Sequence, residues 1–205
     1  MISPSNNCAN CPRLAEFRQQ NCATYPHYHN APVPAFGELN ATHLIVGLAP
    51  GLHGANQTAR PFTGDYAGDV LYAALIKHGL AIGEYGKHAS DGLRLRNIRI
   101  TNSVRCVPPQ NKPTTLEIAT CGQFLQSEIA NMHNLQRILV LGGVSHNATV
   151  KALGGKITTH PFKHGVVYNI ANIELFCSYH TSRYNINTRV LTEAMFDDVI
   201  ARFAG

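Results

Sequence analysis

The sequence predicts an α/β fold of three layers, α/β/α, in which helices cover both faces of a central, mainly parallel four-stranded sheet. Apolar runs typical of buried strands alternate along the chain with segments of helical character, as in successive βαβ units. The 205 residues are 44% hydrophobic and 14% charged, which excludes a generally disordered chain and suits one well-packed core. We therefore expect a single domain over residues 1–205.

Strands are predicted where apolar runs lie between loops. Residues 43–48 (HLIVGL) and 137–143 (RILVLGG) have the continuous apolar character of strands buried on both faces of a parallel sheet. A further strand is expected near 98–104. Residues 165–170 and 173–179 are β-rich and are expected to pair through a turn at 169–172.

Helices are predicted between these strands. Pro12 suits the first turn of a short helix near 12–21, and the first forty residues are otherwise irregular because five prolines interrupt them. Thr114 or Thr115 caps a helix over 114–131, with Glu117 in its first turn. The remaining helices are expected at about 69–79, 144–153 and 188–203.

Three unusual loops follow predicted strands, at 49–68, 102–113 and 178–187. In open parallel sheets, ligands bind beyond the carboxyl ends of the strands. We therefore expect the three loops to converge on one crevice.

The charge balance favours a polyanionic partner. Lys and Arg number 17 and Asp and Glu 12, giving a formal net charge of +5. No apolar run is long enough to cross a membrane, and residues 1–7 lack the regions of a signal peptide. We therefore expect no membrane association and a cytoplasmic location.

Four cysteines have the spacing of a metal site. Cys8 and Cys11 form a C-x-x-C pair within the irregular N-terminal segment, and Cys106 and Cys121 enclose a loop with three prolines. Four thiolates fit either a Cys₄ zinc site or a [4Fe–4S] cluster, and the wide second pair favours the cluster. A redox C-x-x-C and four unrelated buried thiols are the alternatives. Cys177, in an apolar run, is expected to be a core thiol.

The loop after the first strand, GLAPGLHGANQTARPFTGD over residues 47–65, allows close approach of backbone to a ligand. It lacks the Walker lysine pattern and G-x-G-x-x-G, which disfavours nucleoside triphosphates and dinucleotides. Phe62 is either a core side chain or a platform on which a planar ring stacks. Asp65 is either a helix N-cap or a polar site residue.

This loop resembles the first motif of the uracil-DNA glycosylase superfamily, through Ala49-Pro50-Gly51 and the run from Arg60 to Gly64. Gly47-Leu48-Ala49 lacks the carboxylate or Asn that activates water in most of its families, and this absence, together with His53-Gly54, resembles the fifth family, called type B. The runs TNSVRCVPP at 101–109 and SYHTSRYN at 178–185 agree. One departure is Thr181, where the closing motif usually has proline.

The resemblance implies a monofunctional glycosylase that hydrolyses the N-glycosidic bond of uracil, or of other deaminated bases such as hypoxanthine, after the base is flipped out of the DNA. It implies that Asn102 holds the attacking water, that His180 stabilises the leaving base and that Phe62 stacks on it. Asp65 and Asn56 are further candidates for water or sugar contacts. The resemblance also implies a [4Fe–4S] cluster on Cys8, Cys11, Cys106 and Cys121.

Substrate contacts are expected from the loops on either side of this centre, at Ala49, Pro50, Gly51, His53, Ser182 and Arg183. Tyr184 is expected to enter the duplex or lie in a solvated loop. Phosphate contacts are expected from basic side chains at Arg60, Arg105, Lys112 and Arg189. We expect a monomer that associates with the nucleoid, and the sequence leaves a sliding-clamp contact open.

Two alternatives belong to other functional classes. A nucleic-acid-binding protein that is stabilised by zinc or an iron–sulfur cluster would hold flipped or single-stranded bases without forming an abasic site. An electron-transfer protein would have an exposed, reversibly reducible cluster and no preference for damaged DNA.

Overall fold

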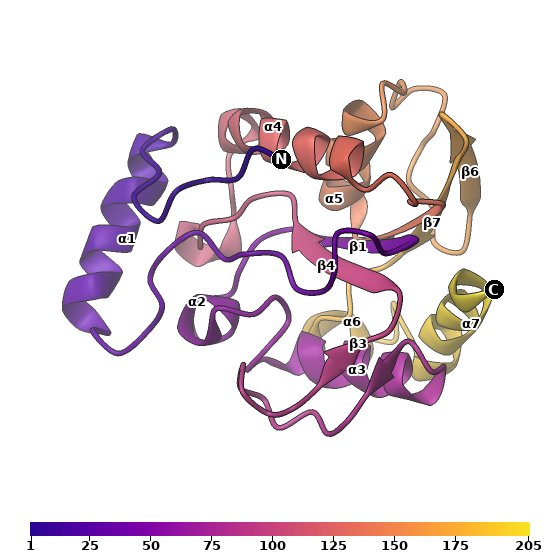
Figure 1. The fold of residues 1–205 in the computed structure, drawn as a ribbon, viewed down its shortest axis with the longest axis horizontal. Helices are drawn as coiled ribbons and strands as arrows, with labels where there is room; N and C mark the ends of the chain where they lie inside the picture. The colour runs from indigo at the N-terminus through magenta and orange to yellow at the C-terminus, as the bar shows by residue number, and fades with distance from the viewer.

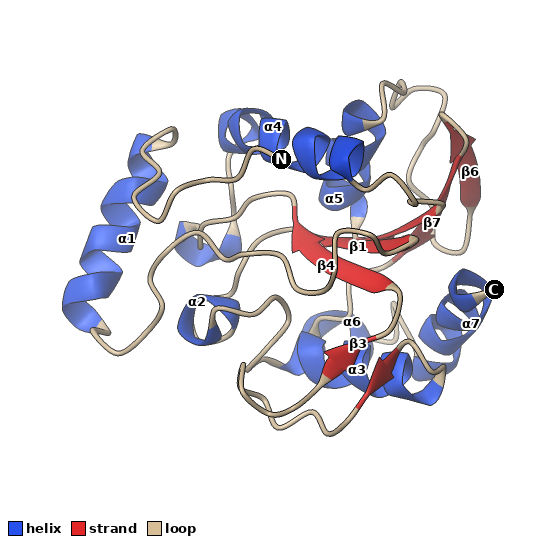
Figure 2. Cartoon of the chain, in the orientation of Figure 1, coloured by secondary structure: helices blue, strands red, loops and turns tan.

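A computed structural model describes residues 1–205. A mainly parallel sheet lies between two layers of helices, as Figure 1 and Figure 2 show, so the predicted three-layer α/β fold is confirmed. The helices are α1 (Pro12–Thr24), α2 (Ala55–Thr58), α3 (Tyr66–Lys77), the short 3-10 helix η1 (Pro109–Asn111), α4 (Thr115–Asn131), α5 (Gly143–Ala152), α6 (Arg183–Asn187) and α7 (Glu193–Ala204). The strands are β1 (His43–Gly47), β2 (Ala81–Ile82), β3 (Arg94–Leu95), β4 (Ile98–Asn102), β5 (Arg137–Leu141), β6 (Val167–Ile170) and β7 (Ile173–Ser178).

The central sheet has the strand order β4-β1-β5-β7-β6. Strands β4, β1, β5 and β7 pair in parallel, and β6 pairs antiparallel with β7 across a turn at 171–172. The expected number of four strands was therefore wrong by one, because the hairpin adds an antiparallel edge strand to the four parallel ones. The inner strand β1 is buried along its whole length, in agreement with its apolar sequence. The edge strand β4 is also buried throughout, although it carries Arg99, Thr101 and Asn102.

Two separate apolar cores hold the layers together. On one face of the sheet, α3 and α7 pack through Leu71, Leu75, Phe196 and Phe203. On the other face, α4 and α5 pack against β1 and β5, and this core includes the buried Cys177 expected there. Figure 1 shows α4 and α5 above the sheet and α3, α6 and α7 below it.

The helix ends follow local capping chemistry. Thr114 caps α4 in a capping box, in which its hydroxyl accepts from the Glu117 amide and the Glu117 carboxylate accepts from the Thr114 amide. The helix expected at about 188–203 is confirmed as α7, but its start was wrong: it begins at Glu193, because the Thr192 hydroxyl caps it by accepting from the Met195 amide. The short helix α6, which was not predicted, has its own cap, since the Ser182 hydroxyl accepts from the Asn185 amide.

Helix α1 lies at one end of the molecule (Figure 1) and is joined to the rest by polar contacts and a small apolar cluster. Arg13 pairs with Glu117 of α4 at 2.7 Å, and the Arg18 guanidinium donates to the Cys8 carbonyl oxygen at 3.0 Å. Leu14 packs with Val104, Cys121 and Phe124 in a third, small apolar cluster. None of the helices has the length and apolar character needed to cross a membrane.

Candidate functional site

A pocket of about 350 Å³ lies beyond the carboxyl ends of β1, β4 and β7, where the three unusual loops meet. Its lining combines apolar and polar groups, from Leu48, Ala49, Pro50, Gly51, Ala55, Phe62, Asp65, Tyr66, Ala67, Asn102, Asn111, His180, Ser182 and Arg183. We call it the central pocket. The size suits a small planar ligand, and nine of the eleven residues predicted to be catalytic or substrate-binding line it.

Asn102 is the last residue of β4 and is 4% exposed. Its side-chain amide lines the central pocket and makes no hydrogen bond to another protein group. Gly47, its register partner on β1, leaves the space that this amide occupies. A Cβ at position 47 would lie 2.4 Å from the Asn102 Oδ1 atom. The buried amide is therefore free to bind a water molecule or a ligand.

Two residues of the loop after β1 that line the same pocket have unpaired backbone donors. The amides of Ala49 and Gly51 donate to no protein acceptor, although both residues line the pocket. A backbone N–H group near a buried site needs a hydrogen-bond acceptor, which protein, water or a ligand can supply. Two N–H groups are thus available to a carbonyl oxygen of a bound ligand.

Two neighbouring rings line the pocket. The Phe62 and His180 ring centroids are 6.1 Å apart with an interplanar angle of 30°. Phe62 is 7% exposed and belongs to the core of the α3 face as well as to the pocket lining. Burial lowers the pKa of the His180 imidazole, and the nearby Asp65 carboxylate partly opposes that effect. The imidazole is therefore neutral at pH 7 and donates through one ring nitrogen.

Asp65 also has two roles. One carboxylate oxygen caps α3 by accepting from the Gly68 amide at 3.0 Å, and the side chain lines the central pocket. A Cβ at Gly54 would lie 2.6 Å from its Oδ2 atom, so the glycine makes room for the second oxygen.

Asn56 and His53 lie outside the pocket lining. Asn56 is 1% exposed, and its amide donates to the Asn30 Oδ1 atom at 2.9 Å, so it joins the loop to the N-terminal segment. His53 is exposed and contacts Tyr28, whose hydroxyl lies 3.1 Å from the His53 Nδ1 atom. These positions give Asn56 an ordering role and leave His53 at the protein surface.

The pocket rim is formed by the loop after β7 and by η1. Ser182 and Arg183 line the pocket, and the Arg183 guanidinium lies 5.1 Å from the centre of the Tyr66 ring. Thr181, where the resemblance expects proline, is fully buried and donates to the Ala67 carbonyl oxygen at 3.1 Å, which fixes the loop in another way. Sequence reasoning assigned no site role to Tyr66 or Asn111, although Asn111-Lys112-Pro113 belongs to the segments that resemble the family.

The four predicted metal-binding cysteines line a second, small cavity between α1 and α4, which we call the thiol cavity. Burial raises the pKa of Cys11 and of Cys106 to about 11, and the Arg18 guanidinium opposes the effect at Cys106. Cys22 and Cys177 lie outside this cavity. No set of three or more His, Cys, Asp or Glu side chains is placed so as to hold one metal ion.

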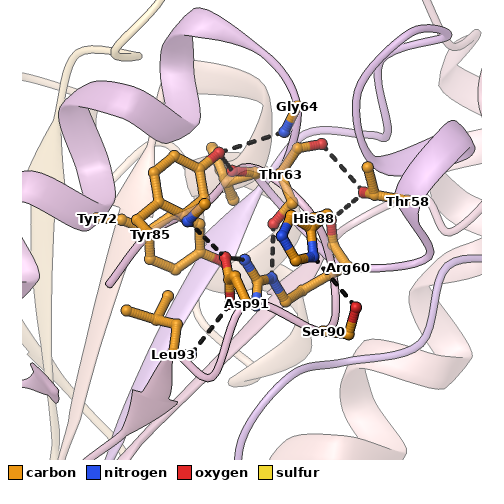
Figure 3. Close-up of polar contacts among 12 residues, drawn as sticks. Thr58, Arg60, Thr63, Gly64, Tyr72, Tyr85, His88, Ser90, Asp91 and Leu93 are labelled. Carbon is orange, nitrogen blue, oxygen red and sulfur yellow. Dashed lines mark hydrogen bonds and ion pairs between the residues drawn. The ribbon is translucent and has the colours of Figure 1, made fainter. Parts of the chain in front are cut away.

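Two of the four expected phosphate contacts were wrong, because their guanidinium groups are buried. Arg60 is 4% exposed and forms a two-pronged ion pair with Asp91 at 2.8 and 2.6 Å, as Figure 3 shows. Arg105 is 6% exposed and pairs with Glu128. Lys112 and Arg189 are exposed and stay available to a polyanion.

Comparisons with known proteins agree with this geometry. Residues 34–204 match the family described as the uracil DNA glycosylase superfamily. The chain is 40% identical over 202 residues to a type-5 uracil-DNA glycosylase of Pyrobaculum aerophilum, covering 97% of this chain and 88% of that protein. It is 42% identical over 203 residues to a type-5 enzyme of Mycobacterium bovis, covering 94% and 75%. A third type-5 enzyme, from Thermus thermophilus, is 38% identical over 199 residues, covering 94% and 90%.

Proposed function

Because this chain belongs to the uracil-DNA glycosylase superfamily, we propose that it removes uracil from DNA and leaves an abasic site. The observation that carries the proposal is the set of unpaired hydrogen-bonding groups in the central pocket. The Asn102 amide and the backbone N–H groups of Ala49 and Gly51 lack protein partners, and they lie in one pocket with the neutral His180. Such groups are costly to bury unless a ligand satisfies them.

Each group matches one requirement of the reaction. The flipped uracil stacks on Phe62, and a pyrimidine carbonyl oxygen accepts from the backbone amides. As the bond from C1′ to the base nitrogen breaks, its electron pair moves onto the uracil ring, and the His180 N–H donates to the carbonyl oxygen that gains charge. Asn102 holds the water whose oxygen bonds to C1′ while its proton passes to solvent. Asp65 stabilises the positive charge that develops on the sugar.

Donors in the pocket also select the class of base. Deamination replaces an amino group of cytosine or adenine by a carbonyl oxygen, so a donor becomes an acceptor. The N–H groups at positions 49 and 51 pair with a carbonyl and leave an amino group unpaired. We therefore expect hypoxanthine to be released as well as uracil, and cytosine and adenine to be rejected.

The DNA would lie over the basic rim of the pocket. Arg183, Lys112 and Arg189 are exposed and are the candidates for phosphate contacts. Tyr184 is 73% exposed at the start of α6, directly after the pocket residue Arg183. In this proposal, its ring fills the space that the flipped nucleotide vacates.

We propose that Cys8, Cys11, Cys106 and Cys121 hold a [4Fe–4S] cluster. Such a cluster takes one thiolate at each iron, and the four thiols line one cavity. The wide spacing of Cys106 and Cys121 favours the cluster over a zinc ion. The cluster would join the N-terminal segment to α4 and to the loop after β4. Purified protein should then contain about four irons per chain and absorb visible light. Cys106→Ala should abolish that absorption, and Cys177→Ala, which removes a buried thiol outside the cavity, should retain it.

The activity is tested with end-labelled duplexes that carry one uracil, one hypoxanthine or no lesion, followed by alkaline cleavage of abasic sites. Strand breaks only at the lesions are expected. Intact strands from protein that retains its visible spectrum would refute the glycosylase assignment and leave a nucleic-acid-binding module.

The role of Asn102 is tested by comparing two asparagine variants. Asn102→Ala should slow release by roughly 10²-fold and leave binding to an abasic duplex intact. Asn56→Ala should lower thermal stability and leave the rate unchanged, since Asn56 lies outside the pocket. The reverse pattern would assign the water to Asn56.

A further inference from the structure

Phe62 occupies a backbone conformation that it would not adopt on its own. Its φ angle is +53°, in the left-handed region that bulky residues avoid. The Phe62 carbonyl passes so close to α3 that a Cβ at Gly68 would lie 1.8 Å from its oxygen. A stacking ring at this position must therefore be held in place by neighbouring groups.

The Tyr85 hydroxyl supplies that restraint. It donates to the Phe62 carbonyl oxygen at 3.1 Å and accepts from the Gly64 amide at 3.2 Å, so one atom spans the turn that carries the ring. Burial raises the pKa of Tyr85 to about 12, which keeps the hydroxyl protonated. Figure 3 shows this hydroxyl directed at Gly64, with the Tyr72 ring beside that of Tyr85.

Tyr85 lies in the segment between β2 and β3, and this segment is fastened to the same loop. Asp91 accepts from the Gly86 and Leu93 amides and pairs with Arg60. The Arg60 guanidinium contacts the Tyr72 and Tyr85 rings, at 5.5 and 5.8 Å from their centres. The Arg60 and Asp91 side chains are 4% and 2% exposed. Solvent therefore competes little with the pair.

We propose that Tyr85 is a positioning residue for base release, whose hydroxyl holds Phe62 in the conformation that stacks on the flipped base, and that the Arg60–Asp91 pair anchors the segment carrying Tyr85. The inference rests on the proposed stacking role of Phe62. Through Tyr85, the segment between α3 and β4 contributes to base release, although neither Tyr85 nor Asp91 lines the central pocket.

The test variant is Tyr85→Phe, which removes only the hydroxyl. Its matched control is Tyr168→Phe, since the Tyr168 hydroxyl donates to the Pro161 carbonyl oxygen at 2.6 Å and lies outside the central pocket. Single-turnover release of uracil should fall about tenfold in Tyr85→Phe, which is about 1.4 kcal/mol, and should be unchanged in the control. Affinity for a duplex with an abasic-site analogue should be unchanged in both, because that duplex has no base to stack.

A double-mutant cycle separates positioning from a general structural effect. Phe62→Leu keeps an apolar side chain but removes the ring, and we expect it to slow release by about tenfold or more. In that background, Tyr85→Phe should cost no further rate, because the ring on which it acts is absent. An equal loss with and without Phe62, or a wild-type rate for Tyr85→Phe alone, would overturn the inference. Failure of the wild-type protein to release uracil would instead refute the proposed function.

Discussion

Replacing Gly47 by alanine tests whether the pocket geometry controls the reaction. The added Cβ would lie 2.4 Å from the Asn102 Oδ1 atom and 2.6 Å from the Phe62 Cζ atom. Nonbonded carbons settle at about 3.5–4.0 Å, so the ring must move by about 1 Å. The amide must move by a similar amount. The one methyl group therefore displaces the proposed water ligand and the proposed stacking ring together.

The expected loss is large in rate and moderate in stability. A displacement of about 1 Å in a reacting group costs roughly 10²-fold in rate. Overpacking of this kind costs about 1–3 kcal/mol of the free energy of unfolding. Single-turnover uracil release and thermal unfolding, measured on the same preparation, separate the two effects.

A second glycine provides the matched control. Gly122 lies within α4, and a Cβ there would meet no atom within 4 Å. Gly122→Ala should therefore leave the rate unchanged and raise stability by about 0.5–1 kcal/mol. A folded Gly47→Ala protein that releases uracil at the wild-type rate would refute the reasoning, because neither Asn102 nor Phe62 would then depend on its observed position.

Three further predictions concern stability and the loop after β7. Ala59 ends α2 with a φ angle of +62°, so Ala59→Gly should raise the urea midpoint by the equivalent of about 0.5–1 kcal/mol; a lower midpoint would contradict this. Thr181→Val removes the hydrogen bond to the Ala67 carbonyl oxygen, and should lower the free energy of unfolding by about 1 kcal/mol in thermal unfolding. It should also slow uracil release, because His180 is the adjacent residue. An unchanged rate would show that the loop needs no such restraint. Burial lowers the pKa of four imidazoles, those of His43, His146, His164 and His180. Below about pH 6.5 the unfolded chain binds protons at these sites that the folded chain does not, so stability should fall from pH 7 to pH 5, and a constant melting temperature would exclude this linkage.

The parts of the fold that sequence reasoning located are those in which local and tertiary preferences agree. The runs at 43–48 and 137–143 are continuously apolar because β1 and β5 are inner strands of the sheet. The capping box of α4 is complete within four residues, from Thr114 to Glu117. The end of the chain was harder: the start of α7 was placed five residues early because its cap at Thr192 was overlooked, and the five-residue helix α6, capped by Ser182, was taken as part of a loop.

The residues that support the site left little trace in the sequence. Strands β2 and β3 have two residues each, too short for any periodic pattern. Asp91 gains its role from Arg60, which lies 31 positions away in the chain. Arg60 itself looks like a surface cation when it is considered alone, and only the structure shows that aromatic rings and a carboxylate enclose it. Most residues that line the pocket were predictable from motifs, whereas the contacts that fix its geometry are long-range.

The central pocket and the thiol cavity are joined by one short stretch of backbone. Asn102 lines the pocket and Cys106 lines the thiol cavity, only four residues further along the chain. Between them, the Ser103 amide donates to the Gly47 carbonyl oxygen at the end of β1, and the Val104 amide donates to the Leu48 carbonyl oxygen, each at 2.9 Å.

Ala49 completes this link, because it packs against the cluster of Val104 and Cys121 and also lines the pocket, with a backbone N–H that has no protein acceptor. A group that holds the four thiols together would thereby also hold the donors that meet the base. Its loss should slow uracil release without any contact to the substrate, and the effect should spread over both Asn102 and the Ala49 amide. A cofactor that only stores electrons would not need to be placed against this loop.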